Sequence, residues 1–178
     1  MTFVAIVPAG GAGTRLWPLS RRSHPKFLID MTGVGRTLIQ ATSDRLEGLA
    51  DDIIVVTGKD HARAVAGQLD LSEDALVIEP SPRGTMPAIG LVAAIVEKRH
   101  GPDAVVGSFA ADHLISDTGA FQQAVRTAID SAKTGKVVTI GITPTSPDTG
   151  FGYIHVGEET TVKGAYAVAE FMEKPDLP

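Results

Sequence analysis

Short apolar runs alternate along this chain with segments of helical periodicity, and this alternation restricts the fold more than any other feature. The helical segments are 37–49, 59–69, 87–100 and 120–133, and the apolar runs that they separate are 3–7, 53–56, 75–78, 104–109 and 137–142. Strands that alternate with helices usually pair in parallel, with right-handed crossovers and helices on both faces. The sequence therefore predicts an α/β fold with a Rossmann-like, mostly parallel sheet.

The pattern changes after Pro147. Residues 151–156 and 165–172 are typical of strands, a charged turn lies between them, and no helical pattern separates them. We therefore expect an antiparallel strand pair near the C-terminus. The chain has 178 residues, 43% of them hydrophobic, and no internal repeat or linker, so a single domain over residues 1–178 is expected.

Charge and composition exclude several classes of function. The chain has 16 lysines and arginines against 21 aspartates and glutamates, a net charge of −5, which argues against a nucleic-acid partner. It has no cysteine, which excludes disulfides and thiolate metal sites. No signal segment or apolar run of membrane-spanning length is present, so we expect no membrane partner and a cytoplasmic location.

A glycine-rich stretch, GGAGTRLWPLS at residues 10–20, follows the first apolar run. Gly10, Gly11 and Gly13 allow a sharp turn and a close approach of the backbone to a ligand, and their N–H groups can converge on an anion. Arg15 adds a guanidinium suited to phosphate, and Lys26 adds a compact positive charge. This stretch is therefore interpreted as a cradle for a polyphosphate.

Two better-known glycine loops do not fit this stretch. A dinucleotide-binding loop requires G-x-G-x-x-G at the start of a helix, but Leu16 occupies the third glycine position and Pro18 interrupts any helix that follows. A P-loop requires Gly-Lys-Ser/Thr, where this chain has Thr14-Arg15. A glycine-rich surface turn with incidental basic residues is the remaining structural alternative.

Residues 10–20 together with Pro25-Lys26 resemble the signature of the sugar-1-phosphate nucleotidyltransferases, the NDP-sugar pyrophosphorylases. The details are most similar to the branch of mannose-1-phosphate guanylyltransferases, also called GDP-mannose pyrophosphorylases. The resemblance implies a glycosyltransferase-A-like fold and transfer of GMP from GTP to mannose 1-phosphate, giving GDP-mannose and pyrophosphate. Two alternatives remain: a pyrophosphorylase that uses UTP or dTTP with glucose 1-phosphate, and a non-catalytic nucleotide-sugar-binding module.

Asp112 follows the apolar run 104–109, so its carboxylate is expected at the carboxyl edge of the sheet, where ligands bind. From spacing alone, a Mg²⁺ ligand and a turn cap are equally open. The resemblance implies that Asp112 binds Mg²⁺ as a catalytic residue. Members of the family continue beyond this length and carry a second metal-binding aspartate there, so the catalytic domain is expected to be truncated at its C-terminal end. The resemblance also leaves a homo-oligomer open.

The resemblance implies roles for the remaining site residues. Arg15 is expected on the β- and γ-phosphates, and Lys26 at the α-phosphate. The segment 79–89 differs from the glutamine-containing segment of uridylyl and thymidylyl relatives, which favours guanine. The residues expected at the nucleotide are Ala9, Gly10, Gly11, Gly13, Thr14, Glu79 and Arg83, and those expected at the sugar phosphate are Gly152, Glu173 and Lys174.

Overall fold

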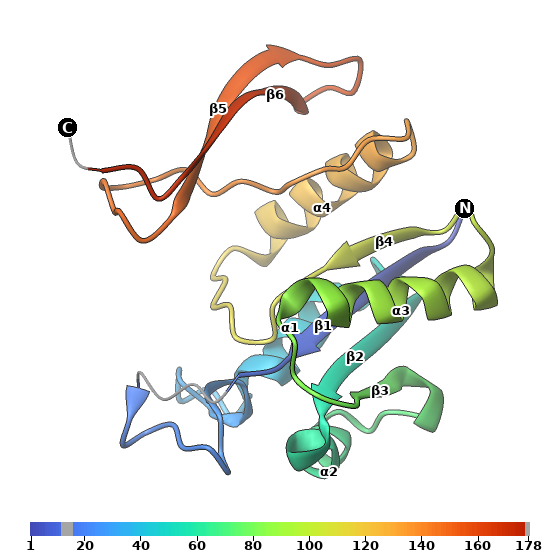
Figure 1. Ribbon diagram of the computed structural model, residues 1–178, viewed down its shortest axis with the longest axis vertical. Helices are drawn as coiled ribbons and strands as arrows, with labels where there is room; N and C mark the ends of the chain where they lie inside the picture. The colour runs from blue at the N-terminus through green and yellow to red at the C-terminus, as the bar shows by residue number, and fades with distance from the viewer. Residues whose placement is uncertain (12–15, 177–178) are drawn as a thin grey trace. The chain divides into compact units, whose positions relative to one another are not determined.

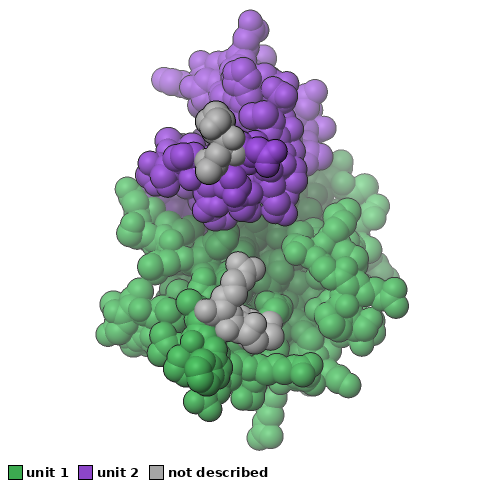
Figure 2. Space-filling view, turned by 60° about the vertical axis from the view of Figure 1, so that its left-hand side comes forward, with its two compact units in different colours: residues 1–118 green, residues 119–178 purple. Residues whose placement is uncertain are grey.

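The computed structural model describes residues 1–11 and 16–176 (Figure 1). The chain divides into two compact units, residues 1–118 and 119–178, which Figure 2 colours separately. Throughout the two described ranges, no helix combines the length and the apolar character that are needed to cross a membrane.

A parallel sheet of four strands forms the centre of the first unit. The strands are β1 (Phe3–Ala9), β2 (Asp52–Gly58), β3 (Leu76–Glu79) and β4 (Val105–Ser108), in the order β3-β2-β1-β4. Strand β1 pairs on both sides, and its residues Val4, Ala5 and Ile6 are fully buried. A strand that is covered on both faces needs apolar side chains on both, which explains the unbroken apolar run. The predicted parallel sheet is confirmed.

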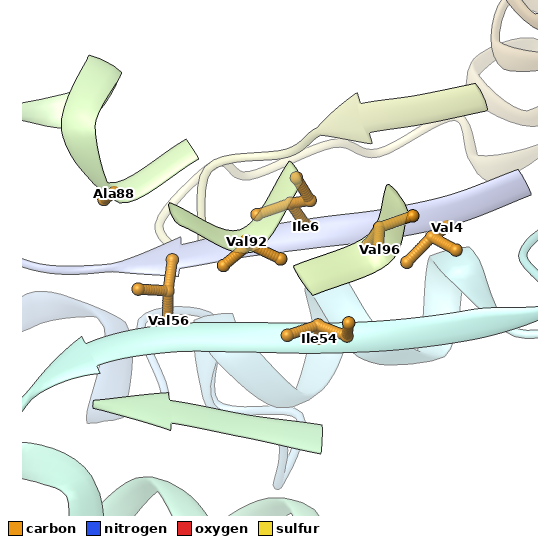
Figure 3. Packing of buried hydrophobic residues seen from close by; sticks show 7 residues of the cluster. All are labelled: Val4, Ile6, Ile54, Val56, Ala88, Val92 and Val96. Atoms are coloured by element: carbon orange, nitrogen blue, oxygen red, sulfur yellow. The ribbon is translucent and has the colours of Figure 1, made fainter. Parts of the chain in front are cut away.

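Helix α3 (Thr85–His100) covers one face of this sheet (Figure 1). Ala88, Val92 and Val96 recur every four residues and form one apolar stripe along the helix. Figure 3 shows this stripe against side chains of β1 and β2. The buried cluster consists of Val4, Ile6, Ile54, Val56, Ala88, Val92 and Val96.

Helices α1 (Leu38–Leu46) and α2 (Lys59–Leu69) provide further buried apolar side chains in this unit. Side chains alternate along a strand, so Ala5 and Val7 of β1 point away from the α3 face. Helix α2 packs against β2 and β3, and α1 packs against α2. The first unit also contains the short 3-10 turns η2 (Lys26–Leu28) and η3 (Glu73–Ala75).

The second unit contains an antiparallel pair, β5 (Gly152–Glu159) and β6 (Tyr166–Glu173), as the sequence predicts. The pairing register shifts twice along the pair, after His155 and again before Glu159. Helix α4 (Thr118–Ala132) starts at the boundary between the units, and Gly135 follows it with φ +81°.

The expectation of a strand at residues 137–142 is wrong. This segment forms no strand in the part of the chain that the structure describes. Val137 and Ile142 are largely exposed, at 102% and 87%. β-Branched residues favour strands mainly through packing against neighbours, and this segment has no strand beside it among the described residues.

Gly107 of β4 provides a test of the packing. A Cβ atom there would lie 2.9 Å from ring atoms of both Phe3 and Phe109, whose rings meet edge to face with centroids 6.3 Å apart. Overpacking of this kind costs about 1–3 kcal/mol, so we expect Gly107→Ala to lower the free energy of unfolding by that amount in urea titrations.

Gly90→Ala is the matched control for this test. Gly90 lies in an exposed turn of α3, and a Cβ there would have no atom within 4 Å. Alanine in a helix interior is favoured over glycine by about 1 kcal/mol, so this variant should be more stable. A Gly107→Ala variant at least as stable as the wild type would contradict the described packing around β4.

Candidate active site

The sheet reverses its strand order between β1 and β4, because β2 and β3 lie on one side of β1 and β4 lies on the other. In open parallel sheets, ligands bind beyond the carboxyl ends of the strands at this point of reversal. Gly10 and Gly11 directly follow β1, and Asp112 follows β4 by four residues. The two strongest sequence signals therefore meet at the edge where a ligand is expected.

The described glycines of the loop leave open space in front of the backbone. Gly10 and Gly11 are exposed, and a Cβ on either would have no atom of a non-adjacent described residue within 4 Å. Gly11 has φ +92°, a conformation that favours glycine. Ala9 is buried, and its carbonyl accepts a hydrogen bond from Thr57 Oγ1 at 2.6 Å. This bond ties the start of the loop to β2.

Three of the predicted phosphate-site residues, Gly13, Thr14 and Arg15, lie outside the described residues. Their predicted contacts with the nucleotide stay predictions.

Lys26 and Asp112 are brought together although 86 residues separate them in the sequence. Lys26 Nζ lies 3.4 Å from Asp112 Oδ2. Both side chains remain accessible to solvent, at 34% for Lys26 and 45% for Asp112. An ion pair of this kind is held loosely, because water screens its charges. Either group is available to a ligand that carries the opposite charge.

The turn that carries Lys26 is fixed by contacts that sequence analysis missed. Phe27 and Leu28 are buried beside it. Gln68 Nε2 of α2 donates to the Leu28 carbonyl at 3.3 Å, and His61 Nε2 lies 2.9 Å from the Arg22 carbonyl. Both side chains contact backbone carbonyl groups. Every residue has such a group, so no residue pattern in the sequence reveals these contacts.

The loop that carries Asp112 continues the pairing of β4 with β1. The Phe109 N–H donates to the Ile6 carbonyl at 2.8 Å, and the Ala111 N–H donates to the Pro8 carbonyl at 3.3 Å. Ala111 is 2% exposed. The backbone is therefore held against β1 up to the residue before Asp112.

A buried guanidinium, that of Arg45 in α1, holds the other side of the same loop. Arg45 Nη2 donates to the His113 carbonyl at 3.1 Å and to Thr42 Oγ1 at 2.8 Å. Burial lowers the pKa of Arg45, and the neighbouring Asp44 carboxylate opposes this shift. In the sequence, an arginine among helical residues looks like an ordinary solvated charge, so sequence analysis did not identify it.

Asp112 supplies one hard oxygen ligand of the kind that Mg²⁺ prefers. The described residues contain no group of three or more His, Cys, Asp or Glu side chains that could enclose a metal ion. Mg²⁺ is commonly bound through one or two carboxylates together with substrate phosphates and water. One accessible carboxylate beside an open glycine loop fits a magnesium ion that a nucleotide brings with it.

The residues expected at the nucleotide base lie at the same edge but on the outer strand. Glu79 is the last residue of β3 and pairs with Gly58 of β2. Arg83 lies in the loop to α3, and its Nε donates to Ser81 Oγ at 3.3 Å. Strand β2 therefore lies between Glu79 and the loop that follows β1. The hydrogen bond described for Arg83 joins it to a residue of its own loop.

The residues expected at the sugar phosphate gather in the second unit. Gly152 and Glu173 are partners in the β5–β6 register, and Lys174 Nζ lies 2.9 Å from Glu173 Oε1. A Cβ on Gly152 would lie 2.6 Å from Phe171 Cζ and 2.9 Å from Glu173 Oε2. The Lys174 N–H donates to the Phe151 carbonyl at 3.1 Å. Gly152, Glu173 and Lys174 therefore form one local cluster.

Comparisons with known proteins identify the family of this chain. The family model described as nucleotidyl transferase matches residues 4–178. The mannose-1-phosphate guanylyltransferase of Escherichia coli K12 is 44% identical over 97% of this chain, and RfbM, an enzyme of the same name from Salmonella typhimurium LT2, is 43% identical over 99%. This chain spans 37% and 38% of their lengths.

A crystal structure from Thermus thermophilus, described as a mannose-1-phosphate geranyltransferase, superposes with a TM-score of 0.86. It is 37% identical, and the match covers 99% of this chain and 51% of that one. The family model and the shared fold lead to one conclusion: this chain belongs to the nucleotidyl transferase family.

Proposed function

We propose that this chain is part of one nucleotidyltransferase catalytic domain that transfers GMP from GTP to mannose 1-phosphate, giving GDP-mannose and pyrophosphate. The observation that carries the proposal is the meeting of Lys26 and Asp112, 3.4 Å apart, at the edge where β1 ends in the open glycines. The names of the Escherichia coli and Salmonella typhimurium relatives support this choice of substrates.

The reaction requires positioning and charge neutralisation more than acid–base chemistry. A phosphate oxygen of mannose 1-phosphate forms a bond to the α-phosphorus of GTP, and the bond from that phosphorus to the bridging oxygen breaks, releasing pyrophosphate. The attacking oxygen is already anionic at neutral pH, so no general base is needed. Holding the reactants in line and stabilising charge on the phosphates supply the acceleration.

Each cation of the site has a distinct task in this proposal. Lys26 stabilises the charge that builds up at the α-phosphate, and Arg15 holds the β- and γ-phosphates of the leaving group. The Gly10–Gly11 backbone lies against the nucleotide, as the open space in front of it allows. Asp112 binds Mg²⁺, which when bound neutralises phosphate charge.

The cluster in the second unit binds the sugar phosphate. Glu173 accepts hydrogen bonds from sugar hydroxyl groups, and Lys174 binds the phosphate. The side chains of Lys174 and Glu173 are 61% and 58% exposed. Replacing their ion pair by contacts with a ligand therefore costs little free energy. Because residue 152 is a glycine, the side chains of Phe171 and Glu173 can occupy the space that a Cβ atom would fill.

Nucleotide selectivity is the first test. GTP, UTP, dTTP and ATP are each titrated into the chain in Mg²⁺ by calorimetry, and we expect the tightest binding for GTP because of the segment around Glu79 and Arg83. A preference for UTP or dTTP would contradict the assignment of guanine. Binding of none of the four would contradict the proposal as a whole.

Transfer is measured as pyrophosphate release with mannose 1-phosphate and with glucose 1-phosphate. The assay uses this chain and a chimera in which it replaces the matching part of the Escherichia coli relative, which supplies the rest of that protein's length. We expect release from GTP with mannose 1-phosphate. A chimera that binds GTP but releases no pyrophosphate would favour a nucleotide-binding module instead of an enzyme.

Lys26→Ala should slow pyrophosphate release by a factor of about 10²–10³, equivalent to about 2.7–4 kcal/mol, as for removal of one preorganised donor. Lys98→Ala is the control, because Lys98 is an exposed lysine in the last turn of α3, away from the carboxyl edge. Turnover that stayed unchanged in Lys26→Ala would exclude the role of Lys26 at the α-phosphate.

Gly10→Ala tests the approach of the nucleotide to the backbone. A methyl group at Gly10 would contact no non-adjacent residue in the ranges 1–11 and 16–176, so the thermal unfolding temperature should not fall. The same methyl group would occupy the space assigned to the nucleotide, and we expect GTP binding to weaken at least about tenfold, or 1.4 kcal/mol. Equal affinity in the wild type and Gly10→Ala would place the nucleotide elsewhere.

A further inference from the structure

Arg45, a buried arginine of the first unit, takes no direct part in the proposed reaction. It lies in the last turn of α1 and is 6% exposed. Burying a guanidinium costs free energy unless its N–H groups find partners. The buried position of the Arg45 guanidinium is therefore explained by the groups to which it donates hydrogen bonds.

The partners of Arg45 link α1 to the loop that carries Asp112. Nη2 donates to Thr42 Oγ1 at 2.8 Å, one turn earlier in the same helix, where Thr42 is 2% exposed. The same nitrogen donates at 3.1 Å to the carbonyl of His113, which is 68 residues away in the sequence. Thr42 orients the guanidinium, and the guanidinium holds the peptide that follows Asp112.

Asp112 is consequently held from both sides. Before it, Ala111 is buried and its N–H donates to the Pro8 carbonyl on β1. After it, the His113 carbonyl accepts from Arg45. With the backbone fixed on both sides, the direction of the Asp112 side chain is set by its own two torsions.

We propose that Arg45 is a positioning residue, which directs the Asp112 carboxylate toward the divalent cation by anchoring the His113 carbonyl. This inference rests on the proposed function, in which Asp112 binds that cation. Groups that orient a metal ligand from behind typically change metal affinity by about 10–100-fold when they are removed. The positive charge also suits the C-terminal end of α1, where helix carbonyl groups converge.

The test measures Mn²⁺ affinity by electron paramagnetic resonance, in the presence of GTP, for the full chain and its variants. We expect Arg45→Met to weaken Mn²⁺ binding by about tenfold, and Arg45→Lys to restore part of it. Lysine keeps the charge but cannot reproduce the planar fork of the guanidinium. Asp112→Asn removes the proposed ligand itself and should weaken Mn²⁺ binding at least as much.

A matched control distinguishes the positioning role of Arg45 from a purely structural one. Val65→Ala removes buried volume from α2, an element that supplies none of the hydrogen bonds described for the loop of Asp112. We expect this control to lower the unfolding temperature while Mn²⁺ affinity is kept. Should the control weaken Mn²⁺ binding as much as Arg45→Met, the positioning role would be overturned.

The remaining outcomes distinguish this inference from the proposed function. Weaker Mn²⁺ binding in Asp112→Asn but wild-type binding in Arg45→Met would reject the role of Arg45 and leave the proposed function standing. Unchanged binding in Asp112→Asn would reject the metal assignment, and the role of Arg45 with it.

A second variant covers the case in which Arg45→Met does not fold. Thr42→Val removes the oxygen that orients the guanidinium and keeps the shape of the side chain. We expect a several-fold loss of Mn²⁺ affinity and faster hydrogen exchange at the amides of residues 111–114. Wild-type values in both measurements would overturn the inference.

Discussion

The burial of β1 between β2 and β4 is the constraint on which the rest of the first unit depends. Both neighbours run parallel to β1, so the chain returns to the same edge of the sheet after each of them. The glycines after β1 and the carboxylate after β4 therefore meet without any direct preference for each other.

The site combines rigid supports with loosely held charges. The backbones beside Lys26 and Asp112 are anchored through buried neighbours, Leu28 and Ala111, and through side chains that bind carbonyl groups. The charged ends remain partly exposed and meet at 3.4 Å. This arrangement suits a polyanion and its counter-cation, because the ligand can replace one weak ion pair without rearranging the backbone.

Much of this arrangement can be read from the sequence, because it follows from periodicity. The apolar run at 3–7 and the glycines after it predict a buried strand that ends at a ligand site, and Asp112 falls in the corresponding place after β4. The supports from Arg45, His61 and Gln68 could not be predicted, since each acts on a distant backbone carbonyl. The prediction of a strand at 137–142 is wrong because the β-propensity of a segment does not reveal whether a neighbouring strand is present to pair with it.

The most direct measurement is a crystal structure of the protein with GTP and Mn²⁺, with the metal located by its anomalous scattering. We predict a Mn²⁺ peak within bonding distance of the Asp112 carboxylate, with the triphosphate against Gly10 and Gly11 and Lys26 turned to a phosphate oxygen. A nucleotide bound with its metal away from Asp112, or bound at a place other than the carboxyl edge between β1 and β4, would contradict it.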